Sequence, residues 1–329
     1  MVHPALFGEE LEQGVIRCTL CPANCRLTDG QQGICTSRYN SGGRLLTDNY
    51  GEAVTLAVDP IEKKPLYHFY PGSRILSTGP NCCNLACSFC QNWSISQQKS
   101  PTRYHPPEEL VQIAHDEKSV GIAFTYSEPL LWYEYILDVA PRAHSAGLKV
   151  VLVTNGYINP KPLSELLPLV DAFNVDLKGM NPKFYSRICK GKVEPVLNNI
   201  RAIAQSTAHL EITNLVISGE NDSSSDISGL VNFVASISDL IPLHFSAYHP
   251  DYRMQNPATS SATLKRAAEI AHRELRFVYL GNIAGLEENN TYCLSCRNLL
   301  IERHGYSVAV RGLAGTACTL CGVASAIRR

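Results

Sequence analysis

The placement of cysteine constrains this chain more than any other feature of its sequence. The 329 residues contain 13 cysteines, and all but Cys189 fall into three groups with short internal spacings. Short spacings let one loop direct several thiolates at one metal ion or cluster, so each group predicts a metal site. The groups are Cys18, Cys21, Cys25 and Cys35 near the N-terminus, Cys82, Cys83, Cys87 and Cys90 in the middle, and Cys293, Cys296, Cys318 and Cys321 near the C-terminus.

Composition excludes several other classes of protein. The net charge is −1, with 45% hydrophobic and 18% charged residues, which argues against a disordered chain or a basic nucleic-acid binder. No apolar run reaches the ~18 residues that a membrane span needs. The acidic start of the chain, MVHPALFGEELEQG, lacks the pattern of a secretory signal. We therefore expect a cytoplasmic protein with reduced thiols and with neither membrane nor nucleic-acid partners.

The middle of the chain alternates apolar strand patterns with amphipathic helix patterns. Short buried strands are predicted at RILSTG, GIAFT, KVVLVT, AFNVDL, LEITNLVI, PLHFSAY and RFVYLG, with helices between them. Such alternation predicts an α/β fold with a partial parallel (β/α)6-type barrel, with functional groups at the carboxyl ends of its strands. The predicted domains are a Cys-rich module at 1–55, the barrel at 56–285, and a zinc-ribbon-like module at 286–329.

The central cysteine motif follows the first barrel strand directly. In NCCNLACSFCQNW, Cys83, Cys87 and Cys90 have the spacing C-x-x-x-C-x-x-C. Three thiolates on a [4Fe-4S] cluster leave one iron open to another ligand. Two rival readings are that Cys82 replaces Cys83 in a different site, or that Cys82 is the fourth ligand of a zinc ion.

This motif and its position resemble the radical S-adenosylmethionine (SAM) superfamily. The resemblance implies that the open iron binds the amino and carboxylate groups of SAM. It also implies that reductive cleavage of SAM gives a 5′-deoxyadenosyl radical, which abstracts a hydrogen atom. Phe89, the aromatic residue before the last cysteine, matches the superfamily pattern.

Further segments resemble the SAM-binding motifs of glycyl-radical activating enzymes such as pyruvate formate-lyase activase. By this resemblance the strand ends carry SAM contacts at Ser127, Glu128, Thr154, Asn155, Asp176 and Lys178. Val153 stands where the activase has Asp, which argues against its cation site. His249 is a candidate for the substrate-proximal histidine of the activase.

Across nearly its whole length the chain resembles the AmmeMemoRadiSam system radical SAM enzymes. The matching segments are CTLCPANCRLTDGQQGICTSR, DPIEKKPLYHFYPGS, CNLACSFCQNW, TYSEPLLWYEY, AYHPDYRM and CLSCRNLLIERHGYSV. Cys82 stands where that family usually has Gly, a residue that serves close backbone approaches. The resemblance implies modification of a protein or peptide, Memo-like and AMMECR-like partners, and an electron donor such as flavodoxin or ferredoxin.

Alternatives remain for the flanking groups and for the function. Four thiolates suit either a structural zinc ion or an auxiliary [4Fe-4S] cluster. Paired C-x-x-C knuckles favour zinc at the C-terminal group, whereas the N-terminal group favours neither. For the function, the alternatives are a glycyl-radical enzyme activase and a non-catalytic, zinc-stapled protein-binding scaffold.

Overall fold

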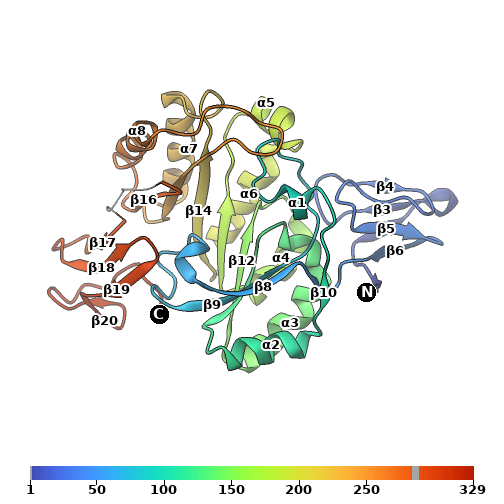
Figure 1. Ribbon diagram of the computed structural model, residues 1–329, viewed down its shortest axis with the longest axis horizontal. Coiled ribbons are helices and arrows are strands. Elements are labelled where there is room, and N and C mark those ends of the chain that lie inside the picture. Colours follow the sequence, from blue (N-terminus) through green and yellow to red (C-terminus); the bar gives the residue numbers. More distant parts are fainter. Residues whose placement is uncertain (1, 284–288) are drawn as a thin grey trace.

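An eight-stranded sheet forms the centre of the computed structural model, which describes residues 2–283 and 289–329 (Figure 1). The strand order is β16-β15-β14-β13-β12-β11-β9-β8, and all neighbours pair in parallel except β8, which is antiparallel to β9. The strands are β8 (Thr55–Pro60), β9 (Arg74–Gly79), β11 (Gly121–Phe124), β12 (Lys149–Thr154), β13 (Ala172–Asp176), β14 (His209–Val216), β15 (Leu243–Ala247) and β16 (Val278–Gly281).

Helices connect the parallel strands and pack outside the sheet. The longest, α7, begins after Ser223, whose side chain accepts a hydrogen bond from the Asp226 amide, as expected for a helix N-cap. The helices are α1 (Trp93–Ser96), α2 (Pro107–Asp116), α3 (Tyr133–Ser145), α4 (Pro160–Leu166), α5 (Pro182–Phe184), α6 (Val193–Ala204), α7 (Ser224–Ile237) and α8 (Ser261–Ala271). Short helical turns are η1 (Glu12–Gly14), η2 (Ile61–Lys63), η3 (Pro129–Trp132), η4 (Leu167–Leu169) and η5 (Tyr185–Cys189).

The predicted alternation of strands and helices is confirmed, and the sheet is larger than a six-unit barrel. Strands β9 and β11 to β16 all run parallel, which makes seven, and β8 adds an antiparallel edge. The connection that joins β8 to β9 spans residues 61–73. The sequence analysis identified this segment by its family resemblance and did not predict β8 or the connection. Because all parallel strands point one way, their carboxyl ends share one edge of the sheet.

The N-terminal segment forms two small sheets beside this barrel, seen in blue in Figure 1. One has the order β1-β6-β5 and the other β2-β3-β4. A further short strand, β7 (Glu52–Ala53), pairs with β10 (Arg103–Tyr104). The strands of the two sheets are β1 (His3–Pro4), β2 (Gly8–Glu10), β3 (Ile16–Cys18), β4 (Arg26–Leu27), β5 (Arg38–Ser41) and β6 (Arg44–Thr47).

The C-terminal segment forms a small module of hairpins, seen in red in Figure 1. Its strands are β17 (Thr291–Tyr292), β18 (Leu299–His304), β19 (Ser307–Val310), β20 (Leu313–Ala314) and β21 (Ala317–Cys318). The buried Arg303 side chain donates a hydrogen bond to the Tyr67 carbonyl at 2.7 Å, which fixes the module to the β8–β9 connection. None of the helices in the described ranges has the length and apolar character needed to cross a membrane.

Candidate cofactor-binding site

The loop after β9 carries the three central cysteines to the carboxyl edge of the sheet. Its backbone is held by η5, because the Ala86 amide donates to the Cys189 carbonyl and the Ser88 amide to the Ile188 carbonyl, both at 3.0 Å. Cys82 has φ of +84°, in the region that favours glycine. Its side chain turns away from the cavity toward the N-terminal segment, where Thr36 Oγ1 lies 3.3 Å from Cys82 Sγ.

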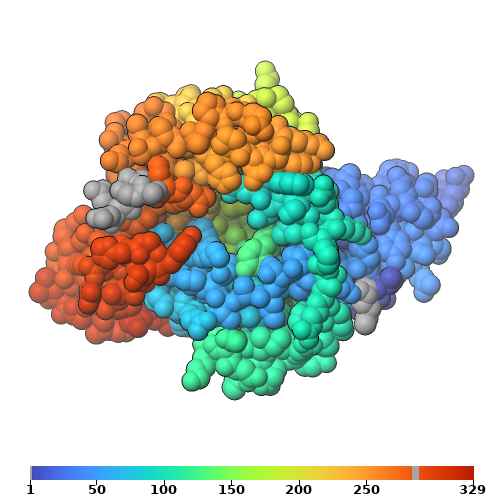
Figure 2. Space-filling view, in the orientation of Figure 1, coloured from blue at the N-terminus to red at the C-terminus, as the bar shows by residue number. Residues whose placement is uncertain are grey.

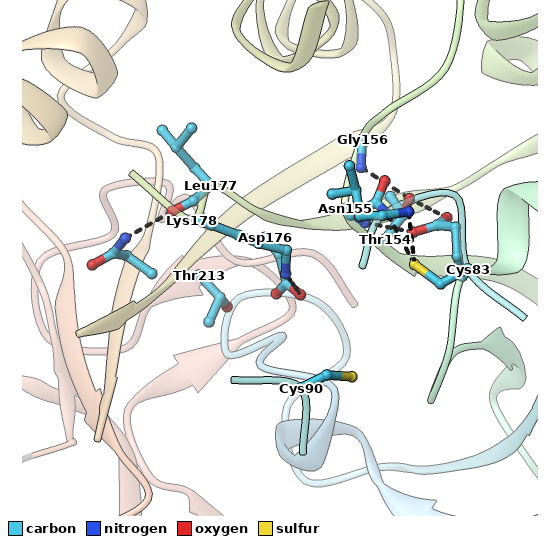
Figure 3. Close-up of polar contacts among 12 residues, drawn as sticks. Cys83, Cys90, Thr154, Asn155, Gly156, Asp176, Leu177, Lys178 and Thr213 are labelled. Atoms are coloured by element: carbon cyan, nitrogen blue, oxygen red, sulfur yellow. Dashed lines mark hydrogen bonds and ion pairs between the residues drawn. The ribbon is translucent and has the colours of Figure 1, made fainter. Parts of the chain in front are cut away.

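The thiols of the loop lie in polar contact with neighbouring elements. Cys83 Sγ accepts a hydrogen bond from Asn155 Nδ2 at 3.5 Å (Figure 3). Cys90 Sγ lies 3.1 Å from Ser96 Oγ. Burial raises the pKa of Cys83 well above its ordinary value. A hydrogen bond with Cys189, together with burial, does the same to the pKa of Cys87. The free thiols are therefore protonated, and metal binding would release these protons.

Glu128 is the buried acid of the site. It follows β11 and is 1% exposed. Its carboxylate accepts hydrogen bonds from the Leu130 amide at 3.0 Å, from Thr154 Oγ1 at 2.6 Å and from the Asn155 amide at 2.8 Å. Burial raises the pKa of Glu128 to about 7, although these three donors act in the opposite sense. The ends of β11 and β12 are thus joined through one carboxyl group that titrates near neutrality.

Asp176 and Lys178 form an ion pair at the end of β13. Lys178 Nζ lies 3.0 Å from Asp176 Oδ2 (Figure 3). It also lies 5.9 Å from the centre of the Phe89 ring. Burial acts to lower the pKa of Lys178, but the negative charge of Asp176 outweighs it and raises that pKa well above its ordinary value. The lysine is therefore a fixed positive charge beside the cysteine loop.

These groups surround one cavity of about 480 Å³. It contains the three loop cysteines and every predicted SAM contact from the strand ends, and Figure 2 shows this face of the molecule hollowed near its centre. The cavity is thus lined by three possible cluster ligands, a buried acid, a cation and an aromatic ring. This set of groups suits the binding of an iron–sulfur cluster together with a zwitterionic cofactor. The predicted residues in the lining are Cys83, Cys87, Phe89, Cys90, Ser127, Glu128, Thr154, Asn155, Asp176 and Lys178.

The cavity also has lining residues that the sequence did not predict as site residues. Tyr306, in the turn between β18 and β19, reaches it from the C-terminal module. Lys63 and Lys64 line it as well, and Asp59 holds both amino groups at 2.9 and 2.8 Å. Tyr126 donates to the same carboxylate at 2.8 Å. All of these residues lie in segments that resemble the AmmeMemoRadiSam enzymes, and the position of Lys63 and Lys64 just before β9 is the sequence signal that favours a contact to an anionic group.

His249 lies apart from this group. Its side chain is exposed, its ring nitrogen lies 3.4 Å from the Pro250 carbonyl oxygen, and it is not among the described residues that line the cavity. The neighbouring Tyr248 is buried instead, with its hydroxyl donating to the Met254 carbonyl at 3.0 Å. The role predicted for His249 stays a prediction, without support from its position.

The two flanking cysteine groups differ in their geometry. The C-terminal sulfur atoms all lie within 4.8 Å of one another, with Cys293 3.6 Å from Cys321 and Cys296 3.6 Å from Cys318. This group could hold one metal ion. In the N-terminal group, burial raises the pKa of Cys21 to about 12, and the thiols of Cys35, Cys18 and Cys25 act in the same direction.

Comparisons with known proteins agree with the fold and with the position of the cysteine loop. The family model of the Radical SAM superfamily matches residues 78–234. The chain is 41% identical to the uncharacterized protein MJ0808 of Methanocaldococcus jannaschii over 98% of both chains. It is 25% identical to the 4-hydroxyphenylacetate decarboxylase activating enzyme of Clostridioides difficile strain CD196, over 43% of this chain and 47% of that protein. The structure of Streptococcus suis SuiB bound to S-adenosylmethionine shares the fold, with a TM-score of 0.52 at 16% identity over 67% of this chain and 51% of SuiB.

Proposed function

Because the chain belongs to the radical SAM superfamily, whose cofactors are a [4Fe-4S] cluster and SAM, we propose that it abstracts a hydrogen atom from a protein or peptide substrate. The observation that carries the proposal is the cavity that joins the three-cysteine loop to the polar ends of β11, β12 and β13. When bound there, the cluster supplies the electron that cleaves SAM.

We assign the following tasks to the residues of this cavity. Cys83, Cys87 and Cys90 hold three irons and leave the fourth open. Glu128 accepts a hydrogen bond from the SAM amino group. Lys178 offsets the negative charge of the SAM carboxylate. Asn155 orients the Cys83 thiolate through its 3.5 Å contact. Phe89 and Ser127 complete the SAM-binding wall of the cavity.

We predict that SAM binding depends on pH through Glu128. Its carboxylate accepts from an amino group better when ionised, and its pKa is about 7. Lowering the pH from 8 to 6 protonates it, so the Kd for SAM should rise roughly tenfold more in the parent than in Glu128→Gln. Calorimetric titration of both proteins at several pH values measures this difference. Parallel pH profiles would contradict the role given to Glu128.

The substrate side of the cavity supports a protein or peptide substrate. Tyr306 is 56% exposed at its mouth, and Lys63 is exposed beside it. The segments 59–73 and 293–308, which resemble those of AmmeMemoRadiSam enzymes, supply these residues. We therefore propose Memo-like and AMMECR-like proteins as partners and a flavodoxin or ferredoxin as electron donor.

A second candidate function is activation of a glycyl-radical enzyme. The similarity to the 4-hydroxyphenylacetate decarboxylase activating enzyme favours it, although the alignment covers less than half of either chain. The two candidates share SAM cleavage and differ only in the partner protein. A zinc-stapled scaffold, the third reading of the sequence, would not cleave SAM.

We propose a structural zinc ion for the C-terminal group. A tetrahedral ion with metal–sulfur bonds of ~2.3 Å places its ligand sulfurs roughly 3.8 Å apart. The two contacts of 3.6 Å fit this spacing. The ion would hold together the hairpins that bring Tyr306 to the cavity.

The deciding experiment measures 5′-deoxyadenosine made from SAM by the reduced, anaerobically reconstituted protein. The parent should form it, and Cys83→Ala should reduce it to background. Cys82→Gly is the matched control, because it removes the adjacent thiol at a φ that suits glycine, and it should retain activity. An iron-replete parent that forms no product, even with candidate partners added, would refute the proposal. Loss of activity in Cys82→Gly alone would instead identify Cys82 as the ligand.

A further inference from the structure

The N-terminal cysteines come from different turns of the two small sheets. Cys18 ends β3, Cys21 follows in the next turn, and Cys25 and Cys35 precede β4 and β5. The Cys18 amide donates to the Cys25 carbonyl at 2.9 Å, which closes the first turn. A β-carbon placed on Gly33 would lie 3.5 Å from Cys25 Sγ and 3.7 Å from Cys35 Sγ. These are ordinary van der Waals distances, so Gly33 lies close to both sulfur atoms.

The spacing of the sulfur atoms separates this group from the C-terminal one. All four C-terminal sulfurs lie within 4.8 Å of one another, whereas within the described residues no three N-terminal sulfurs do. The sulfur atoms of Cys83, Cys87 and Cys90, which we assign to a [4Fe-4S] cluster, do not form such a compact group within the described residues either. Ligands of one ion must be close together, whereas a cubane holds each thiolate on a different iron and so spaces them more widely.

Arg38 provides an independent indication of a ligand. It is 1% exposed, donates to the Leu6 carbonyl at 2.8 Å and forms an ion pair with Glu134. The Arg38 side chain also interacts with the Cys18 thiol, one of the proposed ligands, whereas its buried Nε has no hydrogen-bond partner within the described ranges. A buried N–H group without a partner is costly. The sulfur atoms of an iron–sulfur cluster accept such hydrogen bonds.

From this geometry we propose that Cys18, Cys21, Cys25 and Cys35 hold a second [4Fe-4S] cluster. All four of its irons have a protein ligand, so it has no open position for SAM. The inference rests on the proposed function in one respect, namely that Cys83, Cys87 and Cys90 hold the first cluster.

The second cluster lies next to the first. Thr36, which follows Cys35, contacts Cys82, which precedes Cys83, at 3.3 Å. On the other side, Asn159 Nδ2 donates to the Cys21 carbonyl at 3.1 Å, and the same loop after β12 carries Asn155. The ligand loops of the two sites therefore touch, and the unpaired spins of the two reduced clusters should interact.

Metal analysis of the full chain tests the site. The anaerobically reconstituted parent should contain about eight irons, in two [4Fe-4S] clusters, together with one zinc per chain. Cys83→Ala/Cys87→Ala/Cys90→Ala should keep about four irons with the Mössbauer spectrum of a [4Fe-4S]²⁺ cluster. Cys21→Ser/Cys25→Ser should also keep about four, in a cluster whose EPR spectrum responds to SAM. Cys318→Ser is the control, because it should lose zinc and no iron.

The outcomes separate this inference from the proposed function. If the triple variant contains zinc in place of iron at the N-terminal group, or no metal there, the proposal of a second cluster is wrong. The assignment of the first cluster to Cys83, Cys87 and Cys90 is not affected by that result. A triple variant that loses no iron relative to the parent refutes the assignment of the first cluster. If Cys21→Ser/Cys25→Ser fails to fold, the triple variant still decides, because it leaves the N-terminal group unchanged.

EPR spectroscopy tests the proximity of the two clusters. The reduced parent should show a broadened spectrum that differs from the sum of the spectra of the two variants. A parent spectrum equal to that sum would overturn the adjacent placement.

Discussion

Replacing Lys178 by Met should weaken SAM binding by about 10- to 150-fold, which corresponds to the ~1.5–3 kcal/mol of a hydrogen bond to a charged group. The Lys178 side chain lines the cofactor cavity, is only 14% exposed and remains charged, because Asp176 raises its pKa well above the ordinary value despite the partial burial. Met has a similar length but no charge, so the substitution removes the cation with little change of volume. Equilibrium titration of the anaerobic protein with SAM measures the effect.

Lys63→Met is the matched control for this prediction. Lys63 lines the same cavity and is also paired with an aspartate, but its side chain is 49% exposed. Exposed ion pairs contribute at most about 1 kcal/mol, so this substitution should change the Kd by less than about fivefold. Iron content should stay at the parental level in both variants. Equal losses of affinity in both would show that general positive charge, rather than the position of Lys178, matters.

The buried parts of the barrel were predictable from the sequence. Strands β9 and β12 have the bounds that the apolar runs RILSTG and KVVLVT predict. A strand buried on both faces has a continuous apolar run, and the turns at its ends mark its limits. Once the strands are known, the parallel arrangement places Thr154 and Asp176 at one edge, so the part of the cavity lining that comes from the strand ends followed from the sequence.

Contacts between distant segments were not predictable. The approach of Tyr306 to the cavity depends on how the C-terminal module docks, through contacts such as Arg303 with the Tyr67 carbonyl, 236 residues apart in sequence. The contact of Thr36 with Cys82 likewise joins two modules. Local periodicity reports which face of an element is buried but carries no information on its distant partner. The sequence also could not predict that the His249 side chain lies outside the cavity. After β15 the chain turns and buries Tyr248 instead.

Glu211→Ala should lower the free energy of unfolding by about 3–5 kcal/mol, the cost of breaking a buried charged network. Glu211, in β14, is 0% exposed and accepts hydrogen bonds from four donors. These are the Tyr67 and His68 amides at 3.0 and 2.7 Å, and His209 Nε2 and His244 Nε2 at 2.9 and 2.6 Å. The substitution leaves all four without an acceptor and releases the β8–β9 connection that carries the lysines of the cavity.

The dependence of this effect on pH provides a second measurement. Burial acts to raise the pKa of Glu211, but hydrogen bonds from His209 and His244 outweigh it and hold the pKa well below its ordinary value. The stabilisation by this carboxylate is therefore complete above about pH 4.5 and is lost as the pH falls toward the lowered pKa, so parent and variant should converge in acid. Denaturant unfolding of both proteins from pH 8 down to about pH 2 measures the difference, because the convergence is expected below about pH 4.5. Amide exchange at Tyr67 and His68 reports the same loss locally.

Glu9→Ala, which removes an exposed ion pair with Arg17, is the control and should cost less than about 1 kcal/mol at every pH. A Glu211→Ala protein as stable as this control would show that water or a rearranged backbone satisfies the four donors.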